Sequence, residues 1–200
     1  MHNKINKQKG GYTLIETMIA VSLFIIIVMI GMEALLNADR LANKSQDMRS
    51  IMDNMSFVME DMSRNLRTGT NYHCVDGTVN GTLTSTNSYS CPKGAGISFQ
   101  SAPPVGQWVY YIGTYNGVLG IFKSTNGGGG TFIKLTPDGV AIDTTASYFT
   151  VIGAEAPNPD GSGDSQQPFI IIHLVGTMQY QNVTTPFSLQ TSVSQRQIDI

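Results

Sequence analysis

The residue types best suited to chemistry in this sequence include Cys74 and Cys91, the only two cysteines among 200 residues. In an oxidising compartment such a pair forms a disulfide, which for a loop of this length contributes about 3 kcal/mol in the chain-entropy model. The alternatives are two free thiols, or a metal site shared with the nearby His73. We expect the disulfide, and this expectation depends on which compartment the segment occupies.

A second group of candidate residues has the spacing of a cation-binding loop. Side-chain oxygens recur at every second position at Asn158, Asp160, Ser162 and Asp164. This spacing is typical of calcium loops, but the segment lacks both the complete EF-hand pattern and a distal glutamate that could bind in a bidentate manner. Two interpretations remain, a polar loop between strands and a calcium site. Calcium is the only cofactor that the sequence suggests, and the polar loop is favoured.

Signs of enzymatic chemistry are sparse. The sequence contains no Gly-x-Ser-x-Gly, His-Glu-x-x-His or Cys-x-x-Cys motif, and no Gly-Lys-Ser/Thr follows the glycine run at 127–130. We therefore expect that the protein is not an enzyme. With 12 basic against 14 acidic residues and a net charge of −2, the composition also argues against a nucleic-acid partner.

A third chemical feature lies at the N-terminus, where a glycine pair, Gly10 and Gly11, precedes an apolar run. From Tyr12 to Leu36 the only charged residues are Glu16 and Glu33. These 25 residues would form a helix of roughly 37 Å, whereas about 20 residues suffice to cross a bilayer. Three lysines and no acid precede the run, so the positive-inside rule places the N-terminus in the cytoplasm. We expect a single-pass cytoplasmic membrane protein whose remaining residues lie outside the cytoplasm.

Three interpretations of this segment compete: a cleaved secretory signal, an uncleaved signal anchor, and a specialised leader that is cut before the apolar run. The region after the run reads MIGMEALLNADR and offers no convincing small-x-small cleavage site. Neither of the first two interpretations accounts for the glycine pair or for a carboxylate five residues after it. The third accounts for both.

The segment GGYTLIE resembles the type III signal of type IV prepilins and type II secretion pseudopilins. The resemblance implies cleavage between Gly11 and Tyr12 by a prepilin peptidase that also N-methylates the new terminus. It implies that Glu16 acts in assembly. The sequence departs from the family at Tyr12, where phenylalanine is usual, and at Glu33, where many members carry a helix-bending proline.

The resemblance also implies a function and partners. The chain would be a structural subunit, a minor pilin or pseudopilin, that leaves membrane lipid to join an extracellular or periplasmic filament. Its partners would be the peptidase, other pilins or pseudopilins and, indirectly, an assembly platform protein and an ATPase. The alternative is a tip-located binding module on such a filament, which captures DNA, glycans or a secreted substrate.

The chemistry of Glu16 supports this interpretation independently. A carboxylate inside a membrane helix is costly, although an acid in the first helical turn interacts favourably with the helix dipole. The amine created at Tyr12 of an incoming subunit could pair with Glu16 of its neighbour. Such a pair would set the axial register, because any other register would leave a buried charge unpaired.

These residues require a long helix to position them. No proline or glycine occurs between Asn37 and Arg67, and the apolar residues recur in steps of four and three. We predict one helix over residues 12–67, with a transmembrane and assembly half at 12–36 and an amphipathic half at 37–67. The methionine-rich stripe should pack on a globular head, broadened by Phe57 and Val58. Its members are Met48, Met52, Met55, Met59, Met62 and Leu66.

From Thr68 onward, glycine, threonine, serine and asparagine dominate, and alternation replaces the helical period. We expect a β-rich globular head over residues 68–200, after a basic leader at 1–11. The fold class is therefore α+β, with a long N-terminal helix packed on a globular antiparallel β-sheet head. Strands 118–124 and 132–135 should form a hairpin. The predicted strands are Gly96–Gln100, Gln107–Gly113, Val118–Ser124, Phe132–Leu135, Ser147–Gly153, Phe169–Gln179 and Pro186–Ser194.

Overall fold

The computed structural model describes residues 10–75, 87–102, 106–129, 131–155, 166–180 and 183–196. The chain divides into two compact units, Met1–Gln46 and Asp47–Ile200. Each unit is considered separately here. We call Asp47–Ile200 the head unit.

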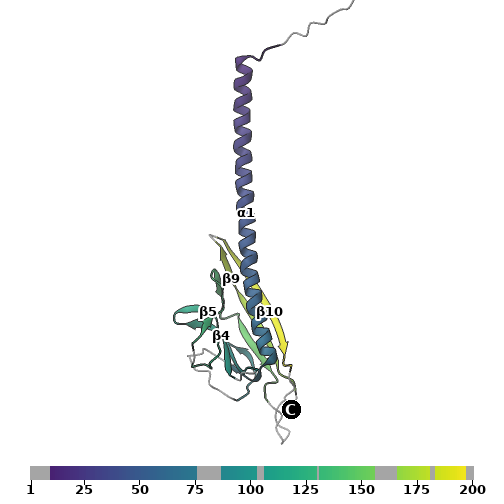
Figure 1. The fold of residues 1–200 in the computed structure, drawn as a ribbon, viewed down its shortest axis with the longest axis vertical. Coiled ribbons are helices and arrows are strands. Elements are labelled where there is room, and N and C mark those ends of the chain that lie inside the picture. Colours follow the sequence, from purple (N-terminus) through teal and green to yellow (C-terminus); the bar gives the residue numbers. More distant parts are fainter. Residues whose placement is uncertain are drawn as a thin grey trace, which may run out of the picture. The chain divides into compact units, whose positions relative to one another are not determined.

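One helix, α1, runs from Leu14 to Thr68 over 55 residues and contributes to both units (Figure 1). At its start, the carbonyl oxygen of Thr13 accepts hydrogen bonds from the backbone N–H groups of Glu16 and Thr17, at 3.1 and 3.2 Å. The helix ends at Thr68, just before Gly69, where an added Cβ would lie 2.4 Å from the ring of Phe99. The predicted helix over residues 12–67 is confirmed with a shift of two residues at its start and one at its end.

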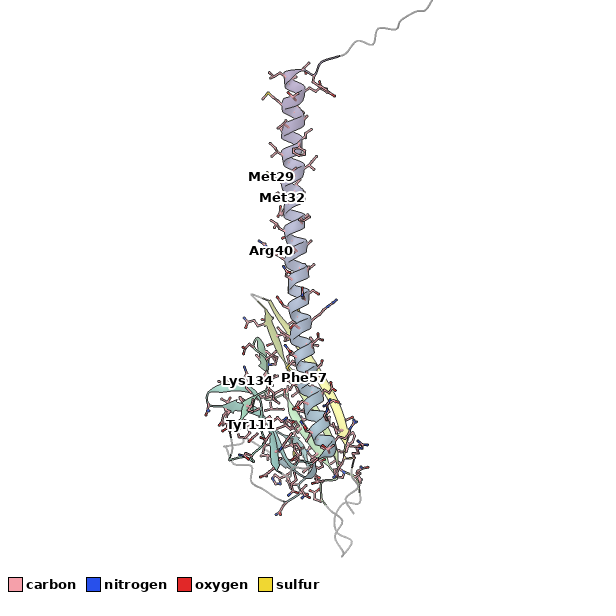
Figure 2. All side chains as sticks on the ribbon, in the orientation of Figure 1. Met29, Met32, Arg40, Phe57, Tyr111 and Lys134 are labelled. Atoms are coloured by element: carbon pink, nitrogen blue, oxygen red, sulfur yellow. A yellow bond between two sulfur atoms is a disulfide. The ribbon has the colours of Figure 1, made fainter. Side chains whose placement is uncertain are left out.

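In the first unit, the helical residues are exposed, except for the half-buried Lys44 near its end (Figure 2). Met29 and Met32 are typical, with 68% and 66% of their surface exposed. The helix is long and apolar enough to cross a membrane, and none of its apolar window is buried. An uncovered apolar helix of this length is stable in lipid or among other helices, but not in water.

The described part of the head unit contains ten strands in two antiparallel sheets, which confirms the α+β class. The first sheet has the order β1-β3-β4-β5-β6, and the second has the order β10-β9-β8-β2 with β7 also paired to β9. The strands are β1 (Thr70–Val75), β2 (Cys91–Gly94), β3 (Gly96–Gln100), β4 (Gln107–Tyr115), β5 (Val118–Ser124), β6 (Ile133–Lys134), β7 (Val140–Ile142), β8 (Tyr148–Ile152), β9 (Phe169–Tyr180) and β10 (Val183–Ser194).

The β4–β5 hairpin shows how the local sequence sets the register. Its two turn residues, Asn116 and Gly117, have φ angles of 50° and 77°. Asparagine followed by glycine is the preferred pair for a two-residue turn with positive φ at both positions. The turn brings Tyr115 opposite Val118. The predicted hairpin between β5 and β6 is also confirmed, with Phe122 opposite Lys134.

The main core lies where the C-terminal part of α1 meets the two sheets. Met55, Met62 and Leu66 are fully buried, so the predicted stripe packs on the head along its C-terminal half. Its N-terminal members, Met48 and Met52, are only half-buried. A smaller cluster elsewhere in the head consists of Val109, Tyr111, Phe122 and Phe132.

One expectation about the stripe was wrong. Phe57 is 72% exposed and does not extend the buried face. Successive helical residues rotate by about 100°, so Phe57 lies roughly 200° from both Met55 and Met59 and points away from the core. Val58 does broaden the stripe, because it is only 7% exposed.

Within the head unit, β10 runs alongside the C-terminal part of α1 and in the same direction (Figure 1). At the start of the strand, the hydroxyl of Thr185 lies 4.0 Å from the sulfur of Met48. Beyond its end, the backbone N–H of Arg196 donates to the carbonyl oxygen of Arg67 at 2.8 Å. This bond satisfies one of the carbonyl groups left without a partner at the helix C-terminus.

Candidate assembly segment and its attachment to the head

The Gly11–Tyr12 peptide bond lies in a short segment, residues 10–13, that precedes the helix and is exposed. A Cβ added at Gly10 or Gly11 would meet no atom within 4 Å, and Tyr12 is 83% exposed. A backbone outside the helix and free of neighbouring atoms has the accessibility that a peptidase requires. The two candidate processing residues, Gly11 and Tyr12, therefore lie in an exposed, non-helical segment.

Glu16 lies in the first turn of α1, where the helix dipole favours a carboxylate. It is exposed, and no ion pair involves it among the described residues. The side chains around it are apolar and exposed, including Ile15 at 67% and Met18 at 64%. Among the described residues, the Glu16 carboxylate therefore has no cation of its own chain beside it.

Glu33 is the second acid in the apolar part of α1, and it is also exposed. It lies 17 positions after Glu16, or about 26 Å along the helix axis. The two carboxylates therefore cannot serve one site, and Glu33 is a matched control for Glu16.

Where α1 meets the first sheet, a polar network joins the two elements. Lys123 on β5 donates to Asp61 on α1, with 2.9 Å between Nζ and Oδ2. The hydroxyl of Tyr110 donates to the same oxygen at 3.1 Å. The Nδ2 of Asn65 lies 3.0 Å from Asp61 Oδ1 and 2.8 Å from the Tyr110 oxygen, within reach of both acceptors. The ammonium group of Lys123 also lies 4.6 Å from the centre of the Trp108 ring.

This network lies at the edge of the core and is partly shielded from water. The side chains of Lys123 and Asp61 are 16% and 32% exposed. Burial raises the pKa of the Tyr110 phenol well above its ordinary value, and the charge of Asp61 raises it further. The phenol therefore stays protonated and remains a donor to Asp61.

The two cysteines form a disulfide, as expected. Cys74 on β1 and Cys91 on β2 have their Cα atoms 5.7 Å apart, and both are buried. The bridge joins the first sheet to the second. Gly94 makes room for it, because a Cβ there would lie 2.5 Å from the sulfur of Cys74.

The disulfide overturns the two alternatives considered for the cysteines. Neither thiol is free. His73 is engaged elsewhere, with its Nδ1 atom 2.7 Å from the carbonyl oxygen of Asn87. Within the part of the chain that the structure describes, no group of three metal-binding side chains occurs.

The four calcium candidates, Asn158, Asp160, Ser162 and Asp164, lie outside the described residues. Just before them, Glu155 accepts hydrogen bonds from the backbone N–H of Ser90, at 2.8 Å, and from the Ser90 hydroxyl. Partial burial pushes the pKa of Glu155 upward, but the hydrogen bonds from Ser90 outweigh it and the pKa is lowered. The Glu155 carboxylate thus already accepts hydrogen bonds from Ser90 of its own chain.

Sequence reasoning missed the network around Asp61. Its partners Tyr110 and Lys123 lie 49 and 62 residues away, so no local spacing connects them. The one available signal was the i, i+4 spacing of Asp61 and Asn65 beside the buried stripe, which places two hydrogen-bonding side chains at the edge of a packed face.

No protein-family model matches the chain, and no curated protein or solved structure matches it.

Proposed function

We propose that the chain is a structural subunit, of the minor pilin or pseudopilin kind, in a type IV-like filament. The observation that carries the proposal is the N-terminal segment: an exposed Gly11–Tyr12 bond, then a bare apolar helix with Glu16 in its first turn. A peptidase would cut between Gly11 and Tyr12. The shortened chain would remain in the membrane through α1 until it joins the filament.

The exposed apolar surface of α1 supports assembly through this helix. Burying one large apolar side chain stabilises a protein by about 1.5–3 kcal/mol relative to leaving it in water. A subunit that leaves the bilayer must therefore cover this surface at once with the apolar helices of other subunits. Directed movement out of the membrane would require an ATPase and a platform protein.

The position of Glu16 supports a register-setting role. Cleavage creates an amine at Tyr12, which would bear a positive charge. In the correct axial position, that amine meets Glu16 of a neighbouring subunit. An unpaired carboxylate buried in an apolar bundle is strongly destabilising, so incorrect positions are disfavoured.

The processing step is tested by mass spectrometry of the mature N-terminus from cells. We expect the chain to begin at Tyr12 with one added methyl group. A chain that begins between residues 33 and 40 would identify ordinary signal peptidase cleavage and would overturn the proposal.

The assembly step is tested by Glu16→Gln, with Glu33→Gln as the matched control. Both variants remove one negative charge from the apolar part of the same helix. We expect Glu16→Gln to lower the amount of chain in sheared filament fractions at least tenfold, with unchanged processing and membrane levels. Glu33→Gln should assemble normally. Equal assembly of the two variants would contradict the role of Glu16.

A further inference from the structure

The free edges of the two sheets differ in how they are protected. Sheet edges expose unpaired N–H and C=O groups, and proteins normally protect them with short strands, lysine, proline or a covering segment. In the first sheet, β6 has only two residues and includes Lys134. At the other edge, β1 is covered by Tyr89, whose carbonyl oxygen accepts from the N–H of Cys74 at 3.0 Å. In the second sheet, β2 has four residues and contains Pro92 and Lys93.

The edge formed by β10 has little of this protection. The strand is 12 residues long, reads VTTPFSLQTSVS and carries no charge. Among the described residues it pairs with one strand, β9, in an unbroken antiparallel register. Its one protective residue is Pro186, which lies near its N-terminal end.

Pro186 also identifies the residues that face the free edge. Proline has no N–H group, and in sheets its nitrogen points away from the neighbouring strand. Because backbone groups alternate along a strand, the other even-numbered residues point their N–H and C=O groups to the same side. Ser188, Gln190, Ser192 and Ser194 are all exposed. Among the described residues, no strand pairs with the backbone groups that these residues direct to that edge.

A groove opens beside this edge, between β10 and α1, with a volume of about 350 Å³. Met59 and Leu189 contribute apolar surface, Ser56 and Ser63 are small helix residues that leave space, and Glu60 is the charged residue in the lining. An additional strand at the edge of β10 would direct alternate side chains toward this groove. The groove is large enough for side chains of moderate size, such as threonine or leucine.

We propose that β10 pairs with β10 of a second copy of this chain, antiparallel and about a two-fold axis near Thr191. Within the described residues, every other sheet edge is short, carries a charge or is covered. In a second copy, β10 is therefore the strand that offers a long, unprotected edge for pairing. The absence of charge on β10 itself permits two identical strands to approach, although Glu60 lines the adjacent groove. In this register Gln190 lies opposite Ser192 of the second copy, Ser188 lies opposite Ser194, and Pro186 remains outside the paired segment.

This contact goes beyond the proposed function. Because β10 runs in the same direction as the last turns of α1, antiparallel pairing places the Asp47–Thr68 helical segments of the two copies in opposite directions. Subunits that share one polarity within a filament cannot make it. The contact joins two heads that belong to separate assemblies, for example two filaments that lie side by side.

The test uses the full chain in nanodiscs that hold one copy each, studied by sedimentation velocity over a range of concentrations. Separate discs prevent contacts through the membrane part of α1, so any pairing of discs arises from the heads. We expect reversible pairing of discs. In Gln190→Lys/Ser192→Lys, like charges face each other across the axis, and the association constant should fall roughly tenfold or more.

Two further samples make the test specific. Thr131→Lys/Thr144→Lys adds the same charge at exposed positions outside β10, and it should pair like the unmodified chain. A mixture of Gln190→Lys/Ser192→Lys with Gln190→Glu/Ser192→Glu should recover pairing, because opposite charges then face each other. Failure of the unmodified chain to pair, or equal pairing by all variants, would overturn the proposal. Glu16→Gln should pair normally, so failure of this proposal is distinguishable from failure of the proposed function.

Discussion

The hydroxyl of Tyr110 is a buried polar group whose protonation is coupled to the folded state. It donates to Asp61 at 3.1 Å, and its pKa is raised by burial and then by that carboxylate. In the unfolded chain the same phenol would titrate near pH 10. Between these two pKa values the unfolded state releases a proton that the folded state keeps.

The sign of the resulting pH dependence follows from linkage. A raised pKa contributes stability that is fully present below pH 10 and is lost as the pH rises toward the folded pKa. We expect the free energy of unfolding to decline with pH above about 10, with a smaller slope in Tyr110→Phe. Tyrosinate absorbance near 295 nm should show that at least one phenol ionises only on unfolding. If all phenols of the folded chain titrate together near pH 10, the assignment is wrong.

At this scale the sequence predicted the disulfide but not the network. With two cysteines there is only one possible pair, so Cys74 and Cys91 could be joined without knowledge of the fold. Asp61, Tyr110 and Lys123 instead meet through the packing of α1 on two strands. Apart from the i, i+4 spacing of Asp61 and Asn65, nothing in their local sequences marks these residues as members of one network.

At the scale of elements, the strong apolar periodicity predicted the helix. The short, irregular strands have no sequence pattern from which they could be predicted. Strands β3 and β5 have the predicted bounds, because both are rich in β-forming residues and end at clear turns. Three strands were missed. In β2, Pro92, Lys93 and Gly94 are poor strand formers, and β7 has only three residues. In β1, Asn71 has a φ of 53°, which interrupts the strand pattern.

The contact between α1 and β5 depends on the ion pair of Asp61 with Lys123. We expect Asp61→Ala to lower the free energy of unfolding by about 1–3 kcal/mol, because it leaves a partly buried ammonium group and a buried phenol without their acceptor. Urea unfolding of the full chain in detergent measures the change.

The controls for this prediction use the same helix and the same pair. Asp53→Ala removes an exposed acid from α1 and should change the free energy by less than about 0.5 kcal/mol. Adding Lys123→Met to Asp61→Ala should recover part of the loss, since no charge then remains unpaired. A loss in Asp53→Ala as large as that in Asp61→Ala would contradict the importance of the network.

At the scale of the whole molecule, the sequence predicted one antiparallel sheet region after a helix, and the head contains two sheets. The division could not be predicted, because it depends on which strands pair across long separations. For example, β2 pairs with β8, some 60 residues later, and not with its neighbour β3. The Cys74–Cys91 disulfide then connects the two sheets covalently.

Reduction tests the contribution of this bridge to the head. Opening it should lower stability by about 3 kcal/mol, or the melting temperature by roughly 5–10 °C, because the unfolded chain gains freedom. Differential scanning calorimetry with and without reductant gives the value, and Cys74→Ser/Cys91→Ser should melt at the reduced temperature in both conditions. An unchanged melting temperature on complete reduction would mean that the bridge adds no stability.

The alignment of β10 with the end of α1 has a mechanical consequence. If the chain is pulled between the Asp47–Thr68 helical segment and the C-terminal end of β10, the load falls on a ladder of 12 residue pairs between β9 and β10 that runs in nearly the same direction. A load in that direction shears the hydrogen bonds between β9 and β10 simultaneously and does not peel them apart one after another. Rupture therefore requires many hydrogen bonds to break at once. Because forced unfolding is governed by the unfolding rate, this geometry gives the head resistance to pulling that its equilibrium stability alone would not reveal.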